Sequence, residues 1–249
     1  MIHVTAGTDV YGAVRSVNGT PIVTKFAMLQ FFPLYPVQSF YLRRLGRRSR
    51  TGVPLIAGTE TRDIVGIPCN RINFLSALVA YLRAIGATLV LFAAMGIFIF
   101  TIGALCDRTV RLSDGGGRTA ALILGTGLAA GLAIALPTYL FTKIVPARDR
   151  RVRQACASFL GIAADPAHVA LEAAKEIIAA AERFMQGYGT PSLDAILSGS
   201  DKHRTDDLTV WLSLVRAQVQ VGGKSSDYER ITDQILDALD AIARTRGAS

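Results

Sequence analysis

The stretch AIGATLVLFAAMGIFIFTIGALC, which runs from Ala84 to Cys106, decides the class of this protein because its 23 residues include no charged side chain. A second stretch of 24 uncharged residues, TAALILGTGLAAGLAIALPTYLFT, runs from Thr119 to Thr142. A helix needs about 20 apolar residues to cross the hydrocarbon core of a bilayer. Core helices of soluble proteins rarely avoid charge over so many turns. The two stretches therefore predict a pair of transmembrane helices.

The linker DRTVRLSDGGGR, Asp107–Arg118, lies between these stretches and ends with three consecutive glycines before its last arginine. Its length is enough to reverse the chain but too short for a domain, so we expect an antiparallel hairpin with both termini on one side.

Basic residues set the expected orientation of this hairpin. Three arginines lie in the linker, and seven basic residues flank the hairpin on the terminal side: Arg71, Arg83, Lys143, Arg148, Arg150, Arg151 and Arg153. The positive-inside rule then predicts a multi-pass protein of the cytoplasmic (inner) membrane with both termini in the cytoplasm. Residues 1–25 lack a signal-peptide pattern, so we expect the first apolar stretch to act as the insertion signal.

The overall composition fits this class. Of the 249 residues, 51% are hydrophobic and 18% charged, whereas soluble domains carry about 25% charged residues. The net charge of +8 is typical of nucleic-acid binding, but the basic excess lies before and around the apolar stretches. We therefore interpret it as topology and lipid contact, and expect no nucleic-acid partner. Cys69, Cys106 and Cys156 have no CxxC spacing, which predicts neither a disulfide framework nor a zinc site.

Residues 1–70 predict a small β-rich cytoplasmic module. Asn18-Gly19 separates two β-prone runs, Val10–Val17 and Pro21–Phe26, and this dipeptide favours a tight hairpin turn. Further candidate strands are Val37–Leu42, Val53–Ala57 and Asp63–Ile67. Four or five short strands would make a small sheet or a partly closed barrel.

Three short motifs and a serine follow one another in this module: Tyr11-Gly12, Thr24-Lys25-Phe26, Phe32-Pro33-Leu34-Tyr35-Pro36 and Ser39. The module resembles the N-terminal module of a set of uncharacterised bacterial two-pass membrane proteins. The resemblance covers about 35 residues and implies no known activity. Those proteins often begin with paired cysteines suggestive of a zinc ribbon. This sequence has no cysteine before Cys69, so no metal role is expected for the module.

The segment Phe26–Val37, FAMLQFFPLYPV, admits two interpretations. Pro33 and Pro36 exclude a regular helix or a central strand through its end. The favoured interpretation is a core strand of the small sheet. In the alternative, the aromatic side chains of Phe31, Phe32 and Tyr35 anchor the segment at the level of the lipid headgroups.

Five arginines lie within the eight residues that run from Arg43 to Arg50, and we treat them as candidate lipid-contact residues: Arg43, Arg44, Arg47, Arg48 and Arg50. Contact with anionic lipid gains about 1 kcal/mol per basic residue near the surface. A solvated loop is the alternative. Both are favoured over nucleic-acid binding, because no aromatic platform or reading helix accompanies the cluster.

Residues 146–249 predict a cytoplasmic helical bundle. The expected helices are about Arg148–Leu160, one after the cap Asp165-Pro166 that ends at Gly187, a short one from Thr190-Pro191 to Leu197, one from Thr205 to Gly222-Gly223, and one after the capping box Ser226–Glu229. Their apolar stripes predict a core, and this domain is the expected place for a protein partner.

Sequence motifs for catalysis are absent: there is no GxSxG, HExxH, Walker or GxGxxG pattern. We interpret His168 and His203 as cap and loop residues, and expect no catalytic residue, cofactor or metal site. Gly127 and Gly131 form a GxxxG motif and are candidate helix-packing residues. They would pack on the first apolar stretch, which we favour, or on a second copy of the chain.

The sequence therefore predicts an α+β membrane protein in three parts: a β module at 1–70, a transmembrane hairpin at 71–145 and a helical domain at 146–249. The leading hypothesis is a non-enzymatic membrane-anchored adaptor or scaffold. The alternative is a subunit of an oligomeric transporter or channel. An enzyme would require a pocket with convergent polar groups.

Overall fold

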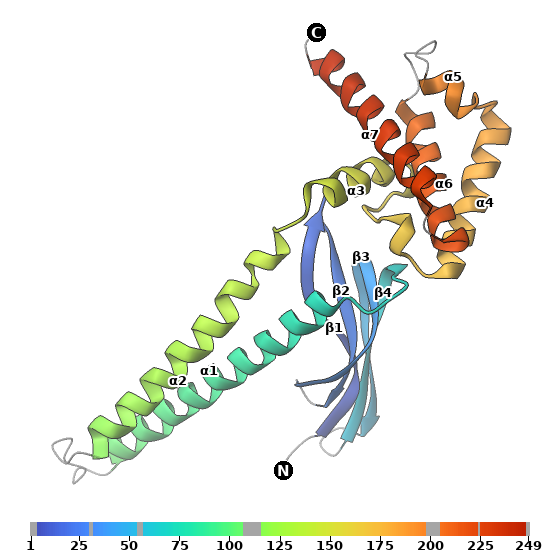
Figure 1. Cartoon of the computed structure of the whole chain (residues 1–249). Helices are drawn as coiled ribbons and strands as arrows, with labels where there is room; N and C mark the ends of the chain where they lie inside the picture. The colour runs from blue at the N-terminus through green and yellow to red at the C-terminus, as the bar shows by residue number, and fades with distance from the viewer. Residues whose placement is uncertain are drawn as a thin grey trace.

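Four strands, two long apolar helices and a group of shorter helices follow one another along the chain (Figure 1). The computed structural model describes residues 4–29, 32–53, 57–106, 116–197, 205–223 and 225–247. It describes the side chains of residues 7–29, 32–46, 63–99, 102, 121–197, 205–223 and 225–245. The linker 107–115 and His203 lie outside the described residues.

The strands are β1 (Val4–Val17), β2 (Thr20–Leu29), β3 (Phe32–Val53) and β4 (Ala57–Pro68). Each pairs antiparallel with the next. Asn18 and Gly19 join β1 to β2 with positive φ angles of 47° and 74°, which is the conformation that a type I′ turn requires. The predicted hairpin is therefore confirmed.

A parallel pairing between β1 and β4 closes the sheet into a barrel. Residues 4–8 of β1 lie beside residues 57–61 of β4. Three antiparallel pairings in succession would make β1 and β4 antiparallel, so the 22-residue strand β3 must change direction along its length. Register shifts between Leu42 and Arg44 and between Leu45 and Arg48 provide the bends.

The strand predicted at Val53–Ala57 is not tested, because residues 54–56 lie outside the described residues; Val53 belongs to β3 and Ala57 to β4. The loop alternative for Arg43–Arg50 is wrong, because this cluster is part of β3 and pairs with β4. A run of arginines hides strand character from a hydrophobic pattern, since backbone pairing does not depend on apolar side chains.

The described part of Phe26–Val37, which excludes residues 30 and 31, combines features of both interpretations. Phe26, at the start of the segment, is fully buried in β2, whereas Leu34, Tyr35 and Val37 on β3 are about half exposed. The Tyr81 hydroxyl of α1 donates a hydrogen bond to the Leu34 carbonyl at 2.8 Å. The beginning of β3 therefore presents apolar side chains to the surroundings next to the first long helix.

The helices α1 (Phe74–Cys106) and α2 (Gly116–Thr138) lie side by side and project away from the barrel, and the short turn η1 (Leu140–Thr142) follows α2 (Figure 1). Two segments within them, Phe74–Ile99 and Ala121–Thr142, are long and apolar enough to cross a membrane. α1 begins before Ala84 because its first turns are amphipathic and pack on the barrel, with Val79 and Ala80 buried.

The remaining helices are α3 (Ala147–Leu160), η2 (Pro166–His168), α4 (Leu171–Tyr188), α5 (Leu193–Leu197), α6 (Thr205–Gly222) and α7 (Ser226–Gly247). α6 is central, because its apolar side chains enter the clusters that α3, α4 and α7 also line. Two expected boundaries need correction. Asp165 caps the short turn η2 and not α4, and α4 continues through Gly187 to end at Gly189, whose φ is +59°.

Candidate functional site

A polar cleft of about 740 Å³ lies where the barrel meets α3, η2, α6 and α7. Its lining is rich in side chains that ionise, which come from both ends of the chain: Arg15, Tyr41, Cys69, Arg71, Arg148, Asp149, Asp165, His168, Arg216 and Glu229. Among the described residues, the largest set of polar groups converges in this cleft, so we treat it as the candidate site.

A buried ion pair forms one wall of the cleft. Arg216 of α6 donates from Nη2 and Nε to the two carboxylate oxygens of Asp165 at 2.6 and 3.0 Å, and both side chains are almost fully buried. Burial raises the pKa of Asp165, but the hydrogen bonds and charge of Arg216 outweigh it and bring the pKa below its ordinary value. The pair therefore stays charged at neutral pH.

Arg153 of α3 connects this wall to the barrel. Its side chain is fully buried, and its guanidinium donates to the carbonyls of Ala163, Arg15 and Thr20 at 2.9, 2.5 and 2.6 Å. It also lies 5.0 Å from the ring centroid of Tyr41. One cation thus satisfies backbone acceptors on both sides of the junction between the barrel and the helical domain.

A second network lies at the outer edge of the cleft. Arg148 of α3 pairs with Glu229 and Asp233 of α7, and Arg216 pairs with Glu229 at 3.2 Å. The charge and hydrogen bond of Arg148 lower the pKa of Glu229. These pairs hold α3, α6 and α7 around the cleft.

Asp149 is the acid with an unused hydrogen-bonding position. Its Oδ2 atom is buried and accepts no hydrogen bond from any described residue, and the nearest cation, Nη1 of Arg153, is 3.8 Å away. Burial raises the pKa of Asp149, and Arg153 offsets only part of this effect. This oxygen can accept a hydrogen bond from a ligand that enters the cleft.

Two cations of the lining, Arg15 and Arg71, make no ion pair with any other described residue. Arg71 is exposed and Arg15 is half-buried. Each can receive a carboxylate, which a guanidinium binds with two parallel hydrogen bonds. The arrangement is therefore suited to binding an acidic group.

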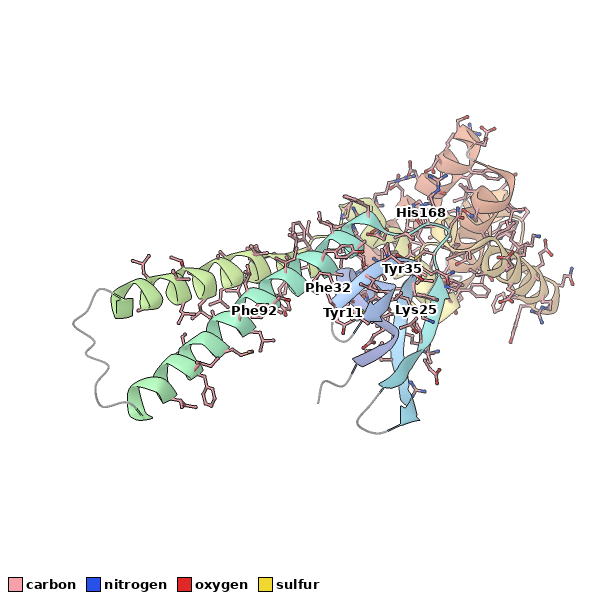
Figure 2. The ribbon with its side chains drawn as sticks, turned by 90° about the horizontal axis from the view of Figure 1, so that it is seen from below. Tyr11, Lys25, Phe32, Tyr35, Phe92 and His168 are labelled. Carbon is pink, nitrogen blue, oxygen red and sulfur yellow. The ribbon has the colours of Figure 1, made fainter. Side chains whose placement is uncertain are left out.

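The cleft offers little for nucleophilic chemistry. Burial raises the pKa of the Cys69 thiol to about 12, so the thiol is protonated at neutral pH and is a weak nucleophile. His168 lies at the rim with 61% of its side chain exposed, and its Nε2 atom is 3.8 Å from Asp165 Oδ2 (Figure 2).

The sequence-predicted site residues lie elsewhere. Arg43 and Arg44 are exposed on β3, and the side chains of Arg47, Arg48 and Arg50 lie outside the described set.

The GxxxG glycines face the first apolar helix of the same chain. A Cβ on Gly131 would lie 2.8 Å from the Gly86 carbonyl oxygen, and one on Gly127 would lie 3.7 Å from Ala93 Cβ. A larger residue at position 131 would therefore clash with the backbone of α1.

Sequence reasoning missed the cleft and its central residues. Asp165 was interpreted only as a cap, and Arg153 was counted among the basic residues that flank the membrane. Nothing in the sequence indicates their burial, because their partners are many residues away. The one available signal is the position of Arg216 between Val215 and Ala217, in a helix rich in apolar residues.

These features define a protein with a four-stranded barrel, a pair of apolar helices and a helical domain that share a polar cleft. No protein-family model, curated protein or solved structure matches the chain. The resemblance to uncharacterised bacterial membrane proteins therefore stays a prediction.

Proposed function

We propose that the protein is a non-enzymatic adaptor of the inner membrane, which binds an acidic group of a protein partner in the cleft between its barrel and its helical domain. α1 and α2 cross the membrane in this proposal, and both termini are cytoplasmic. The observation that carries it is the polar cleft between the barrel and the helical domain, in which Arg15 and Arg71 make no ion pair with any other described residue.

The exposed apolar surface of the helix pair supports the membrane part of the proposal. Large side chains along α1, including Phe92, Phe98 and Ile99, are 63–65% exposed, and Figure 2 labels Phe92 on this helix. Leu122 and Ile123 of α2 are 68% and 61% exposed. Patches of this extent are too costly in water and mark contact with lipid or with another protein. The length of the two helices favours lipid.

The rigid path from the helix pair to the cleft supports the adaptor part. The Ser76 hydroxyl of α1 donates to the Gly12 carbonyl at 2.7 Å and accepts from Thr24 at 2.9 Å, which joins α1 to the barrel. Arg153 then joins the barrel to α3. A partner bound in the cleft would be held at a fixed place relative to the membrane.

The transporter or channel alternative has no specific observation in its favour. Its motive was the GxxxG face, and α1 of the same chain covers Gly127 and Gly131. The two helices contain two charged residues, Arg83 in α1 and Arg118 in the first turn of α2, whereas ion pathways usually place several ionisable groups within the membrane.

Site-specific photo-crosslinking in the cells that make the protein tests this proposal. A photoreactive amino acid at Ile72, which lines the cleft, should give one discrete adduct with another protein, and one at Tyr188, which is 74% exposed away from it, should not. The adduct should disappear in Arg15→Glu/Arg71→Glu and persist in the matched control Arg43→Glu/Arg44→Glu. Adducts with copies of this chain alone, or an adduct that survives the cleft substitutions, would contradict the proposal.

The membrane part has its own test. The chain should stay in the membrane pellet after alkaline carbonate extraction, and its release into the supernatant would refute an integral membrane protein.

A further inference from the structure

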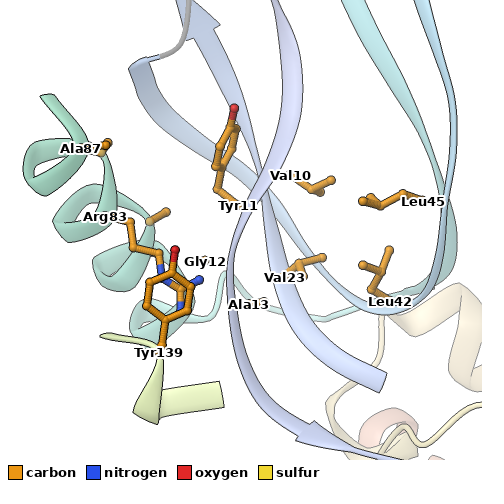
Figure 3. A pocket seen from close by; sticks show the side chains of 12 residues that line it. Val10, Tyr11, Gly12, Ala13, Val23, Leu42, Leu45, Arg83, Ala87 and Tyr139 are labelled. Atoms are coloured by element: carbon orange, nitrogen blue, oxygen red, sulfur yellow. The ribbon is translucent and has the colours of Figure 1, made fainter. Parts of the chain in front are cut away.

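A second cavity, of about 530 Å³, lies between the barrel and the start of the long helices. Figure 3 shows Val10, Val23, Leu42 and Leu45 on its barrel side. Arg83 and Ala87 of α1 lie on its other side, together with Tyr139 at the end of α2 (Figure 3). Apart from Arg83 and the tyrosines, its lining side chains are aliphatic.

Arg83 is the one charged side chain of this lining, and it has no anionic partner among the described residues. Its Nε and Nη2 atoms donate to the side chain and the carbonyl of Thr138 at 2.9 and 3.0 Å. Its guanidinium lies 4.3 Å from the ring centroid of Tyr139. These contacts orient the cation but do not neutralise it, and Nη1 remains available as a donor.

The position of Arg83 along α1 is also specific. It is the last charged residue before the uncharged stretch that begins at Ala84. Ala80, one turn earlier, is buried against the barrel, whereas Ile85 is 43% exposed. The cavity therefore lies where α1 leaves the barrel and turns its apolar surface outward. In a bilayer this is the level of the headgroups, where arginine and tyrosine side chains meet lipid phosphates.

We propose that this cavity is a binding site for one anionic phospholipid, whose phosphate pairs with Arg83 and whose acyl chain lies along the aliphatic lining. The inference rests on the membrane insertion in the proposed function. The chemistry that selects the ligand is a single half-buried cation next to an apolar groove, which suits a molecule with one anionic head and one long apolar tail. A site of this kind would secure the barrel against the headgroups.

Lipid titration of the delipidated full-length protein in detergent tests the site, with the bound fraction read by native mass spectrometry. The probes are phosphatidylglycerol, phosphatidylcholine with the same chains, and glycerol 3-phosphate. We expect phosphatidylglycerol to bind more tightly than phosphatidylcholine, and glycerol 3-phosphate not to bind at the same concentrations. Binding of glycerol 3-phosphate as tight as that of phosphatidylglycerol would overturn the proposal in favour of a soluble phosphate ligand.

Substitutions locate the binding. Arg83→Gln should weaken phosphatidylglycerol binding by about tenfold or more, since it removes a charge-assisted contact, and Arg83→Lys should restore part of it. Ala84→Leu, which fills the groove, should weaken binding without removing a charge, and it carries the test if Arg83→Gln does not fold. Lys143→Gln removes an exposed cation outside the lining and is the matched control.

The outcomes separate this site from the proposed function. Equal phosphatidylglycerol binding by all variants would overturn the site while carbonate-resistant membrane association stands. Release of the wild-type chain by carbonate would overturn the proposed function together with this inference.

Discussion

The barrel is joined to its two neighbours by opposite kinds of chemistry. At the junction with α1 the contacts are neutral: the hydroxyls of Thr24, Ser39 and Ser76 form a chain of bonds at 2.8 and 2.9 Å that ends on the Gly12 carbonyl. The junction with the helical domain contains an apolar cluster that includes Val14, Ile22 and Val169. We call it the ionic junction because buried charges accompany this cluster: the guanidinium of Arg153, which donates to barrel carbonyls, and the pair of Asp165 and Arg216 within the helical domain.

Because of this difference, the two junctions should respond differently to pH, salt and ligands. Neutral hydroxyls do not titrate near neutral pH, so the hydroxyl contacts between the barrel and α1 are insensitive to pH and salt. Buried charges need every partner in place, because an uncompensated charge in the interior is costly. The ionic junction also leaves a cleft between its elements, in which charged groups remain available to a ligand.

The largest expected effect is at the ionic junction. Arg153→Met keeps much of the side-chain volume but removes the donors to three carbonyls. We expect a loss of about 4 kcal/mol in the free energy of unfolding, measured by denaturant titration, because buried acceptors are left unpaired. The control Arg150→Met changes an exposed arginine of the same helix and should cost less than about 0.5 kcal/mol. Equal effects would show that burial of Arg153 does not matter.

Gly12→Ala probes the neutral junction by steric conflict. A Cβ at Gly12 would lie 1.8 Å from the Ser76 carbonyl oxygen, and the φ of Gly12 is +70°. We expect a loss of about 3 kcal/mol in stability. Gly19→Ala is the matched control, because its φ of +74° imposes the same backbone strain but nothing lies within 4 Å; it should cost about 1 kcal/mol. A Gly12 variant no worse than the Gly19 variant would contradict the close approach of α1 to the barrel.

Asp165→Asn tests the pH response of the ionic junction. The folded-state pKa of Asp165 is below its ordinary value, so its contribution is fully present above the unfolded pKa of about 4 and is lost as pH falls through the lower folded pKa. We expect a loss of about 2 kcal/mol at pH 7. The stability of the variant should fall less on acidification than that of the wild type. Parallel pH profiles would argue against an ionised Asp165.

The smallest expected effect is that of Ser76→Ala, which removes a single buried hydroxyl from the neutral junction. A loss of about 1–2 kcal/mol is expected, with no dependence on salt between 0.05 and about 0.5 M. Ser16→Ala, at a half-buried serine of β1, should have a smaller effect. If the loss of stability in Ser76→Ala depended on salt, the contacts between the barrel and α1 would not be purely neutral.

The features that the sequence predicted correctly are those that depend on residues close together in the chain. The turn at Asn18-Gly19, the apolar stretches and the helices after residue 146 each depend on neighbouring residues, so pattern and capping rules located them. The parallel pairing of β1 with β4 escaped prediction, because it depends on bends in β3 that arginine-rich residues conceal.

The candidate site was less predictable than the fold. Its wall joins Arg15 and Arg153, 138 residues apart, and Asp165 and Arg216, 51 residues apart. Each residue has an ordinary local role in the sequence, as a strand, flank or cap residue. Only the packing of the helical domain on the barrel brings them to one place in the fold.

Distance measurement across the ionic junction tests most directly the claim that the barrel and the helical domain form one rigid body. Spin labels would be placed at two exposed positions, Arg43 on β3 and Arg230 on α7. Pulsed electron–electron double resonance in lipid nanodiscs would then measure the distance between the labels, with and without the substitution Arg153→Met. The account predicts one narrow distance distribution in the otherwise wild-type chain and a broad one in the variant. A broad distribution already present without the substitution would contradict it.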